Sequence, residues 1–257
     1  MKNILECLIE LKKLGVTAVK QSTEDEGSSF QDILMMRKIT NKVGIKLNVK
    51  VGGCEAKNDI FYCKRIKADA IVAPMVESNY ALKKFIQCAG VSKNCSLYVN
   101  LETRLAIKNL NKIVSSNSFS KIDGVVIGRS DLAGSMNKSK DFVNSKKIFR
   151  IAEKAYRYIS QKKNKKIIFK MGGSITPLSK NFIEDLYNKK LLNYVETRNI
   201  EIKLSRKTLN NLDNIIIKGF HFEKEWLKKR AQFIKKVDPF LAKEYQKRIK
   251  AIIKREN

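Results

Sequence analysis

Acidic side chains follow several of the short apolar runs in this 257-residue sequence, each where the apolar pattern stops. Glu24, Asp25 and Glu26 follow the first run, Glu102 follows the fourth, and Asp131 follows the fifth. Carboxylates gathered at one place repel one another unless a cation neutralises them. A hard divalent ion, bound by one or two carboxylates together with water and substrate oxygens, meets that requirement. The pattern therefore predicts a metal-assisted reaction with Mg²⁺, or alternatively Mn²⁺, as the cofactor.

Lys50 lies within the second apolar run, and its amino group is open to several interpretations. It could bind the oxyanion of a substrate, act as a base with a lowered pKa, or form a Schiff base. A purely structural alternative is that Lys50 pairs with a nearby carboxylate, as buried lysines usually do. Cys54, which follows two glycines, has no evident partner base, so we expect it to be a packing residue.

Glycines also stand at the ends of these runs, at positions 52–53, 128 and 172–173. They would let a substrate approach the main chain, where successive amides could hold a carboxylate or a phosphate. Turn glycines and helix-capping acids are, however, needed in any fold of this kind. That structural explanation suffices for a single residue, but it does not require so many acids at one edge.

The apolar runs and the segments between them define the elements that position these residues. Seven runs are rich in β-branched residues and too short for helices: Val16–Lys20, Lys46–Val51, Ala70–Pro74, Leu97–Leu101, Gly124–Gly128, Ile167–Met171 and Tyr194–Arg198. Segments with helical spacing precede or separate them: Met1–Leu14, Phe30–Lys42, Asp59–Ile66, Tyr80–Ala89, Arg104–Ser115, Ser145–Gln161 and Leu178–Asn188. Apolar strands that alternate with helices indicate a parallel sheet buried on both faces. We predict an α/β fold, a (β/α)8-type TIM barrel whose strand C-termini form the active face.

An eighth strand is not evident in the sequence. Either residues 210–218 supply it, or the barrel is incomplete. From His221 onward the sequence is typical of helix and is interrupted at Pro239, which predicts two helices or one kinked helix. We therefore divide the chain into a barrel domain, residues 1–220, and an extended helical C-terminus, residues 221–257, whose apolar side could pack on another subunit.

Composition excludes several classes of protein. The chain has 53 Lys and Arg against 25 Asp and Glu, a formal net charge of +28. Because this charge is spread along the whole chain, we expect a solvated surface rather than a nucleic-acid site. No apolar stretch is long enough to span a bilayer and no signal-peptide cleavage region is evident, so we expect a cytoplasmic protein with no membrane partner. The five cysteines form no C-x-x-C pair, which indicates free thiols rather than a zinc site.

Three segments together resemble the HpcH/HpaI aldolase and citrate-lyase-beta-like family, which are metal-dependent carbon–carbon lyases built on a β/α barrel. Within a likeness that runs from about Val16 to Arg198, the segments that carry it are Ala73–Ser78, Leu101–Arg104 and Ile127–Leu132. Their order and spacing are more specific than any one of them alone. The resemblance implies that Glu102 and Asp131 are the ligands of Mg²⁺.

The resemblance also implies which residues contact the substrate. The main-chain amides of Ser130 and Asp131 would hold the carboxylate of a pyruvate-like acid. With them we assign Gly128, Arg129 and Lys50 to substrate binding. Family members commonly have a helical C-terminus that packs across subunits, which implies a homo-oligomer.

Two positions depart from the family pattern. Lys50 aligns with the family's usual substrate-binding arginine, and a lysine lacks the bidentate guanidinium fork. The aldolase branch has a histidine base in the first acidic loop, where this chain has Glu24-Asp25-Glu26, a match to the Glu-Asp pair of the citrate-lyase-like branch. His221 is the only histidine and lies beyond the barrel. Any general base must therefore be a carboxylate, a lysine or a metal-bound water.

We therefore expect a Mg²⁺-dependent carbon–carbon lyase, of aldolase or citrate-lyase type. It would cleave or form a C–C bond through a metal-stabilised enolate of a small 2-oxo acid or acyl thioester. Lys50, Glu24, Asp25 and Glu26 are the catalytic candidates. The alternative is a catalytically altered barrel that binds the metal and the oxo acid as a binding or regulatory protein.

Overall fold

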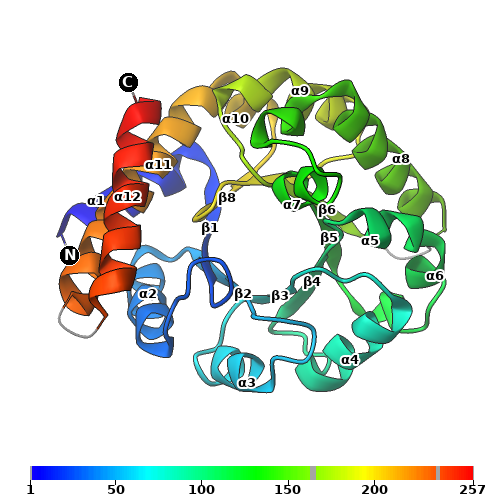
Figure 1. Ribbon diagram of the computed structural model, residues 1–257, viewed down its shortest axis with the longest axis horizontal. Coiled ribbons are helices and arrows are strands. Elements are labelled where there is room, and N and C mark those ends of the chain that lie inside the picture. Colours follow the sequence, from blue (N-terminus) through cyan, green and yellow to red (C-terminus); the bar gives the residue numbers. More distant parts are fainter. Residues whose placement is uncertain (1, 163–165, 236–237, 257) are drawn as a thin grey trace.

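The computed structural model describes residues 2–162, 166–235 and 238–256, so Met1 and Asn257, the outer limits of the two predicted domains, lie outside the described residues. Eight strands form a closed barrel in sequence order: β1 Val16–Ser22, β2 Lys46–Lys50, β3 Ala70–Ala73, β4 Ser96–Asn100, β5 Gly124–Gly128, β6 Ile168–Gly172, β7 Tyr194–Glu196 and β8 Ile200–Lys203. Figure 1 looks into the ring of strands, which helices surround. The predicted α/β barrel is therefore confirmed.

Helices cover the outside of the barrel. They are α1 Lys2–Leu14, α2 Phe30–Val43, α3 Lys57–Arg65, α4 Asn79–Ala89, α5 Arg104–Lys108, α6 Leu110–Val114, α7 Arg129–Gly134, α8 Lys146–Lys162, α9 Lys180–Asn188, α10 Arg206–Asn210, α11 Leu212–Ile234 and α12 Pro239–Glu256. Short 3₁₀ turns lie at Phe119–Lys121, Lys140–Asn144 and Pro177–Ser179. The single helix predicted over 104–115 is two short helices, because the chain turns at Asn109, whose side-chain amide donates to the Glu77 carbonyl at 2.9 Å.

The eighth strand is β8, and the two alternatives considered from the sequence are both wrong. Residues 210–218 are helical, at the end of α10 and the start of α11, and the barrel is closed. β8 follows β7 after a tight turn at residues 197–199, so it runs antiparallel to both β7 and β1, whereas β1 to β7 pair in parallel. A hairpin of this kind needs no crossover helix. The alternation of strands and helices in the sequence therefore does not predict β8.

Alternate residues of each strand face opposite sides of the barrel wall, as the strand period of two requires. Outward side chains of every strand join the helices in one large apolar core. Inside the barrel, a small apolar cluster of Ala70, Val72, Tyr98 and Val126 occupies one side. The inner positions of β6, β7 and β8 include buried charged residues, described below.

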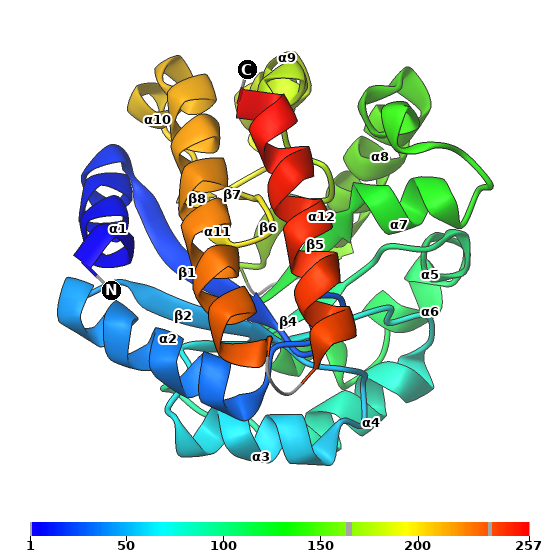
Figure 2. The ribbon, with the colours of Figure 1, turned by 60° about the vertical axis from the view of Figure 1, so that its left-hand side comes forward.

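The C-terminal part is a helical hairpin in which α12 folds back along α11 (Figure 2). Tyr245 and Ile252 of α12 are buried on this inner side. α11 is continuous across residue 220, where the predicted domain boundary lies. The division into a barrel domain and a C-terminal extension stays a prediction, and so does the packing of that extension on another subunit. Among the described helices, none combines the length and the apolar character needed to cross a membrane.

Candidate active site

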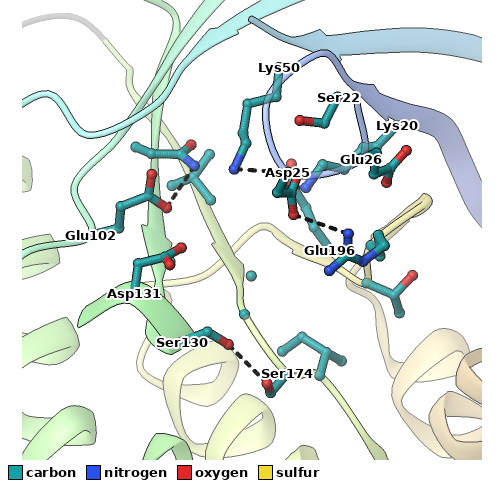
Figure 3. A pocket seen from close by; sticks show the side chains of 18 of the residues that line it. Lys20, Ser22, Asp25, Glu26, Lys50, Glu102, Ser130, Asp131, Ser174 and Glu196 are labelled. Carbon is teal, nitrogen blue, oxygen red and sulfur yellow. Dashed lines mark hydrogen bonds and ion pairs between the residues drawn. The ribbon is translucent and has the colours of Figure 1, made fainter. Parts of the chain in front are cut away.

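A polar cavity of about 320 Å³ opens at the carboxyl ends of the parallel strands. Five lysine or arginine side chains and six aspartate or glutamate side chains line it. They come from the strand ends and the loops after them, from the turn at residues 197–199, and from both C-terminal helices. The sequence placed its candidates at this face, and the cavity is where most of them meet (Figure 3).

Glu102, two residues after the end of β4, has a carboxylate held in a fixed position. The residue is 1% exposed. One carboxylate oxygen accepts a hydrogen bond from the Met75 amide at 3.1 Å, and the other accepts from the Asn100 side-chain amide at 2.9 Å. The carboxylate also lies over Gly128 at the end of β5, where a Cβ atom would overlap it. A glycine is therefore required at 128 by close packing and not by backbone conformation.

Asp131, in the first turn of α7, lies beside Glu102 (Figure 3). Burial and then the charge of Asp131 raise the pKa of Glu102 to about 7, against the opposing effect of Lys50. The two carboxyl groups from adjacent strand ends thus share one region of the cavity and repel each other when both are ionised. Two ligands of one cation would have to lie this close together, and the ligand role that the resemblance implies for them stays a prediction.

The donor set fits a hard divalent cation. Two carboxylates are present, and the side-chain oxygen of Asn100, which also lines the cavity, is buried and has no hydrogen-bond partner in the part of the chain that the structure describes. Across the described residues, no group of three or more His, Cys, Asp or Glu side chains is placed to enclose a metal ion. Mg²⁺ suits such a partial set, because it usually retains waters and takes substrate oxygens as further ligands.

Lys50, at the end of β2, is paired with the acidic loop. Its ammonium nitrogen lies 2.5 Å from a carboxylate oxygen of Glu24 and 3.9 Å from one of Asp25. Burial acts to lower the pKa of Lys50, but the carboxylates of Asp25, Glu102 and Glu24 outweigh it, so the pKa is raised. A lysine base or a Schiff-base lysine needs a neutral amine, so the geometry favours Lys50 as a fixed positive charge between the acidic loop and Glu102.

The three acids of the first loop have different environments. Glu24 is engaged by Lys50 and does not line the cavity. Asp25 lines it, and although burial acts to raise its pKa, Arg198 and Lys50 lower it overall, so Asp25 is a stable carboxylate. Glu26 differs from both, because burial raises its pKa to about 7.

Glu26 is also held in place while one of its oxygens stays unpaired. Oε1 accepts a hydrogen bond from the Asn199 side-chain amide at 2.9 Å, and Oε2 is buried with no partner among the described residues. The Arg230 guanidinium of α11 donates to the main-chain carbonyls of Glu26 and Gly27 at 3.1–3.2 Å. A rigid carboxyl group at the cavity wall, with one oxygen that accepts no hydrogen bond from the described residues, can take part in proton transfer.

Arg129, expected to bind substrate, is directed away from the cavity. It is fully buried, and its guanidinium donates to the carbonyls of Gly173 and Ser174 and to side-chain oxygens of Asn144 and Ser179. Burial lowers the pKa of Arg129 to about 10, and the group lies over the Phe182 ring. Arg129 thus ties the loop after β6 to the start of α7 and does not line the cavity.

Ser130 does line the cavity, beside the loop that follows β6. Its hydroxyl lies 2.9 Å from that of Ser174. Gly173 has a positive φ of 82°, and a Cβ at that position would overlap the amide nitrogens of Arg129 and Ser130. The close approach of these two segments fixes the amides at the start of α7.

A charged network inside the barrel was not anticipated from the sequence. Lys20 of β1 lies 2.5 Å from Glu196 of β7, and both line the cavity. Below them, Lys170 of β6 is buried against Glu201 and also faces Glu196 at 3.9 Å, with its ammonium over the Tyr98 ring. The signal was available, since each of these residues is a charged side chain at an inward position of an otherwise apolar strand.

The cysteines play no evident part in this site. All five are free thiols. Burial raises the pKa of Cys54 to about 11, so this residue at the rim is not a thiolate nucleophile.

The fold and the cavity define a class of protein, the β/α-barrel enzymes with an acidic centre at the carboxyl ends of the strands. Within that class the chain belongs to the HpcH/HpaI aldolase/citrate lyase family, whose sequence profile matches residues 16–171. Membership supports a lyase-type enzyme that acts on small molecules. No curated protein sequence matches the chain.

Solved structures with the same fold are distant in sequence. An HpcH/HpaI aldolase from Desulfitobacterium hafniense DCB-2 is 13% identical with a TM-score of 0.62, over 77% of this chain and 82% of that chain. The citrate synthase SbnG is 12% identical with a TM-score of 0.62, over 76% and 81%. A family protein from Burkholderia cenocepacia J2315 is 10% identical with a TM-score of 0.61, over 84% and 90%. At these identities the likeness shows the fold alone.

Proposed function

We propose that this chain is a Mg²⁺-dependent carbon–carbon lyase that acts on a small 2-oxo acid or an acyl thioester, with Mn²⁺ as an alternative cation. The observation that carries the proposal is the pair of carboxyl groups of Glu102 and Asp131, which share one side of a cavity at the carboxyl ends of β4 and β5. Membership of a lyase family supports the reaction class. A homo-oligomer in the cytoplasm belongs to the same proposal.

The cation held by Glu102 and Asp131 would polarise the carbonyl of the 2-oxo acid and stabilise enolate charge. The remaining roles belong to the chain itself. The amides of Ser130 and Asp131, fixed by the packing of Gly173 against the start of α7, would hold the substrate carboxylate next to Gly128. Lys50 would orient Asp25 and offset the negative charge of the acidic loop, so that an anionic substrate can enter.

Glu26 is the group we assign to proton transfer. Glu24 is engaged by Lys50, and Asp25 is held ionised by Arg198 and Lys50, whereas Glu26 has a free buried oxygen and a pKa near neutrality. A carboxyl group of that pKa can exchange a proton with a substrate carbon or oxygen at physiological pH.

The proposal is tested by following the methyl protons of pyruvate in deuterated water by NMR. This exchange reports enolisation without knowledge of the second reactant. We expect exchange that requires Mg²⁺, is abolished by EDTA, and is lost in Glu102→Gln and Asp131→Asn. Glu26→Gln should also lose exchange but should still bind oxalate, an enolate mimic, in calorimetry with Mg²⁺.

Matched controls are available on the surface. Glu153→Gln and Asp141→Asn make the same chemical changes at side chains outside the cavity, and both variants should exchange at the wild-type rate. Wild-type exchange after chelation, or full activity in Glu102→Gln, would contradict the proposed metal chemistry.

The second candidate is a barrel that binds the metal and the oxo acid without turnover. The favouring observation is that Lys50, which stands where the family has a substrate-binding arginine, is occupied by Glu24 and Asp25. This alternative predicts Mg²⁺-dependent oxalate binding with no exchange of pyruvate protons, and any exchange above the metal-only background would exclude it.

A further inference from the structure

Two arginines from different parts of the chain meet at the cavity. Arg198 lies in the turn between β7 and β8, Arg248 lies in the middle of α12, and both line the cavity. The same carboxylate oxygen of Glu223 lies 2.5 Å from Nη2 of Arg248 and 3.9 Å from Nε of Arg198, so the two guanidinium groups are close neighbours. Two positive charges at short range repel each other, so negative charge must lie near them to offset the repulsion.

The protein satisfies only part of this positive charge. Glu223 of α11, 3% exposed, lies 2.6 Å from Nε and 2.5 Å from Nη2 of Arg248. The same carboxylate oxygen is 3.9 Å from Nε of Arg198, and Asp25 is 3.3 Å from Nη1 of Arg198. One buried carboxylate thus lies between two guanidinium groups.

Arg198 retains its hydrogen-bonding capacity. Within the described part of the chain it forms two ion pairs but donates no hydrogen bond, and 28% of its side chain is exposed. A guanidinium group has five N–H donors in a planar fork that matches carboxylate and phosphate. Arg248 adds a second fork, of which the Nη1 side has no protein partner among the described residues.

This pair lies away from the two proposed metal ligands. Arg198 comes from the turn between β7 and β8 and Arg248 from α12, whereas Glu102 follows β4, which lies across the closed ring of strands from β8. The cavity has six acidic and five basic side chains, and a divalent cation would make the total positive. That excess attracts an anionic ligand, and the N–H donors of Arg198 and Arg248 that the described residues leave unused are the groups that could bind a second negative group.

We propose that Arg198 and Arg248 bind a second anionic group, a carboxylate or a phosphate, at the end of the substrate opposite its 2-oxo acid group. This inference rests on the proposed function for the 2-oxo acid end. The arginines determine specificity and do not touch the reacting carbon. Because Arg248 comes from α12, the C-terminal helix of the chain is part of the substrate site.

The test compares ligands that differ only at the far end. The dissociation constants of 2-oxopentanoate, 2-oxoglutarate and 2-oxo-4-phosphonobutyrate are measured by calorimetry in the presence of Mg²⁺. We expect the wild type to bind one or both of the doubly anionic ligands at least about tenfold more tightly than 2-oxopentanoate. The tighter of the two identifies the group as carboxylate or phosphate.

Arg198→Gln and Arg248→Gln should each remove most of this preference while changing the affinity for 2-oxopentanoate by less than about twofold. Arg157→Gln, at an exposed position of α8, changes the net charge equally and should keep the wild-type preference. Arg248→Lys keeps an ion pair with Glu223, so it is the control for a folding defect caused by loss of that ion pair. Fluorescence of the buried Trp226 in α11 reports whether the hairpin of α11 and α12 is still packed in each variant.

The outcomes separate the two proposals. If none of the 2-oxo acids binds with Mg²⁺, the proposed function is wrong and this inference falls with it. If 2-oxopentanoate binds as tightly as the doubly anionic ligands, or if the preference survives in both glutamine variants, only the role of the arginines is overturned.

Discussion

Gly128→Ala tests whether the position of Glu102 sets up the site. A Cβ at residue 128 would lie 2.8 Å from Cβ of Glu102 and closer still to its Oε2, whereas carbon atoms in contact are normally about 3.5–4.0 Å apart. The φ of Gly128 is −87°, which alanine adopts freely, so the backbone adds no penalty. The effect therefore comes entirely from the overlap with Glu102.

The overlap leaves two responses, and both are unfavourable. If Glu102 stays, overpacking lowers the free energy of unfolding by about 1–3 kcal/mol. If Glu102 rotates away, it gives up hydrogen bonds from the Met75 amide and the Asn100 side chain, each worth roughly 1.5–3 kcal/mol to a charged group. Because the added Cβ would come closest to Oε2, we expect the carboxylate to move, and Mg²⁺-dependent oxalate affinity should then fall at least about tenfold.

Urea unfolding and oxalate calorimetry measure the two effects. Gly134→Ala is the matched control, because it lies at the end of α7, the helix that begins directly after Gly128, and has no atom within 4 Å of the added Cβ. It should be neutral or stabilising by about 0.4–1 kcal/mol. In a Glu102→Gly background, the destabilisation by Gly128→Ala should largely vanish. An unchanged oxalate affinity in Gly128→Ala would refute the assigned position of Glu102.

Three further predictions concern the groups around the site. Lys170→Met leaves Glu196 and Glu201 without their shared buried cation, and should reduce the free energy of unfolding in urea by about 3–5 kcal/mol. Arg129→Lys keeps the charge but loses the guanidinium fork that donates to several carbonyls, and should reduce the free energy of unfolding by about 2 kcal/mol or more in the same assay. Burial raises the pKa of Glu26 from 4.5 to about 7, so the folded state holds this proton more tightly than the unfolded chain does, and stability falls as the pH rises from about 4.5 to 7. Relative to Glu26→Gln, which has no titrating group at this position, the wild type should therefore lose up to roughly 3 kcal/mol of unfolding free energy between about pH 4.5 and 7. Above about pH 7 the difference between the two proteins should no longer change with pH.

The parallel part of the barrel could be predicted because β1 to β6 are apolar runs followed by helices, and β7 is an apolar run preceded by one. β8 could not, since Ile200–Lys203 is four residues long and follows β7 without a helix. The sequence run predicted as Tyr194–Arg198 thus contains β7 and the turn that leads to β8. Hairpin strands this short lack the periodicity on which such predictions rest.

The site was predictable where a motif or a strand end marked it. Glu102 and Asp131 come together as their motifs indicated. Arg129 is in a motif as well, but its side chain points into the protein and not into the cavity. A sequence motif does not show in which direction a side chain points. Arg248 lies on a helix far from any strand end, so only the folded hairpin shows that it reaches the cavity.

The cavity combines residues from the part of the chain that matches the family profile with residues beyond that part. The family match ends at residue 171, and it includes Glu102, Asp131 and the first acidic loop. Arg198, Glu223 and Arg248, which form the other side of the cavity, all lie beyond that limit. Residues that perform a common reaction step must keep their geometry, whereas residues that recognise the rest of the substrate are free to differ between enzymes. The division of this cavity therefore predicts that the enolate chemistry belongs to the barrel and that the choice of substrate belongs to the segment from the β7–β8 turn to α12.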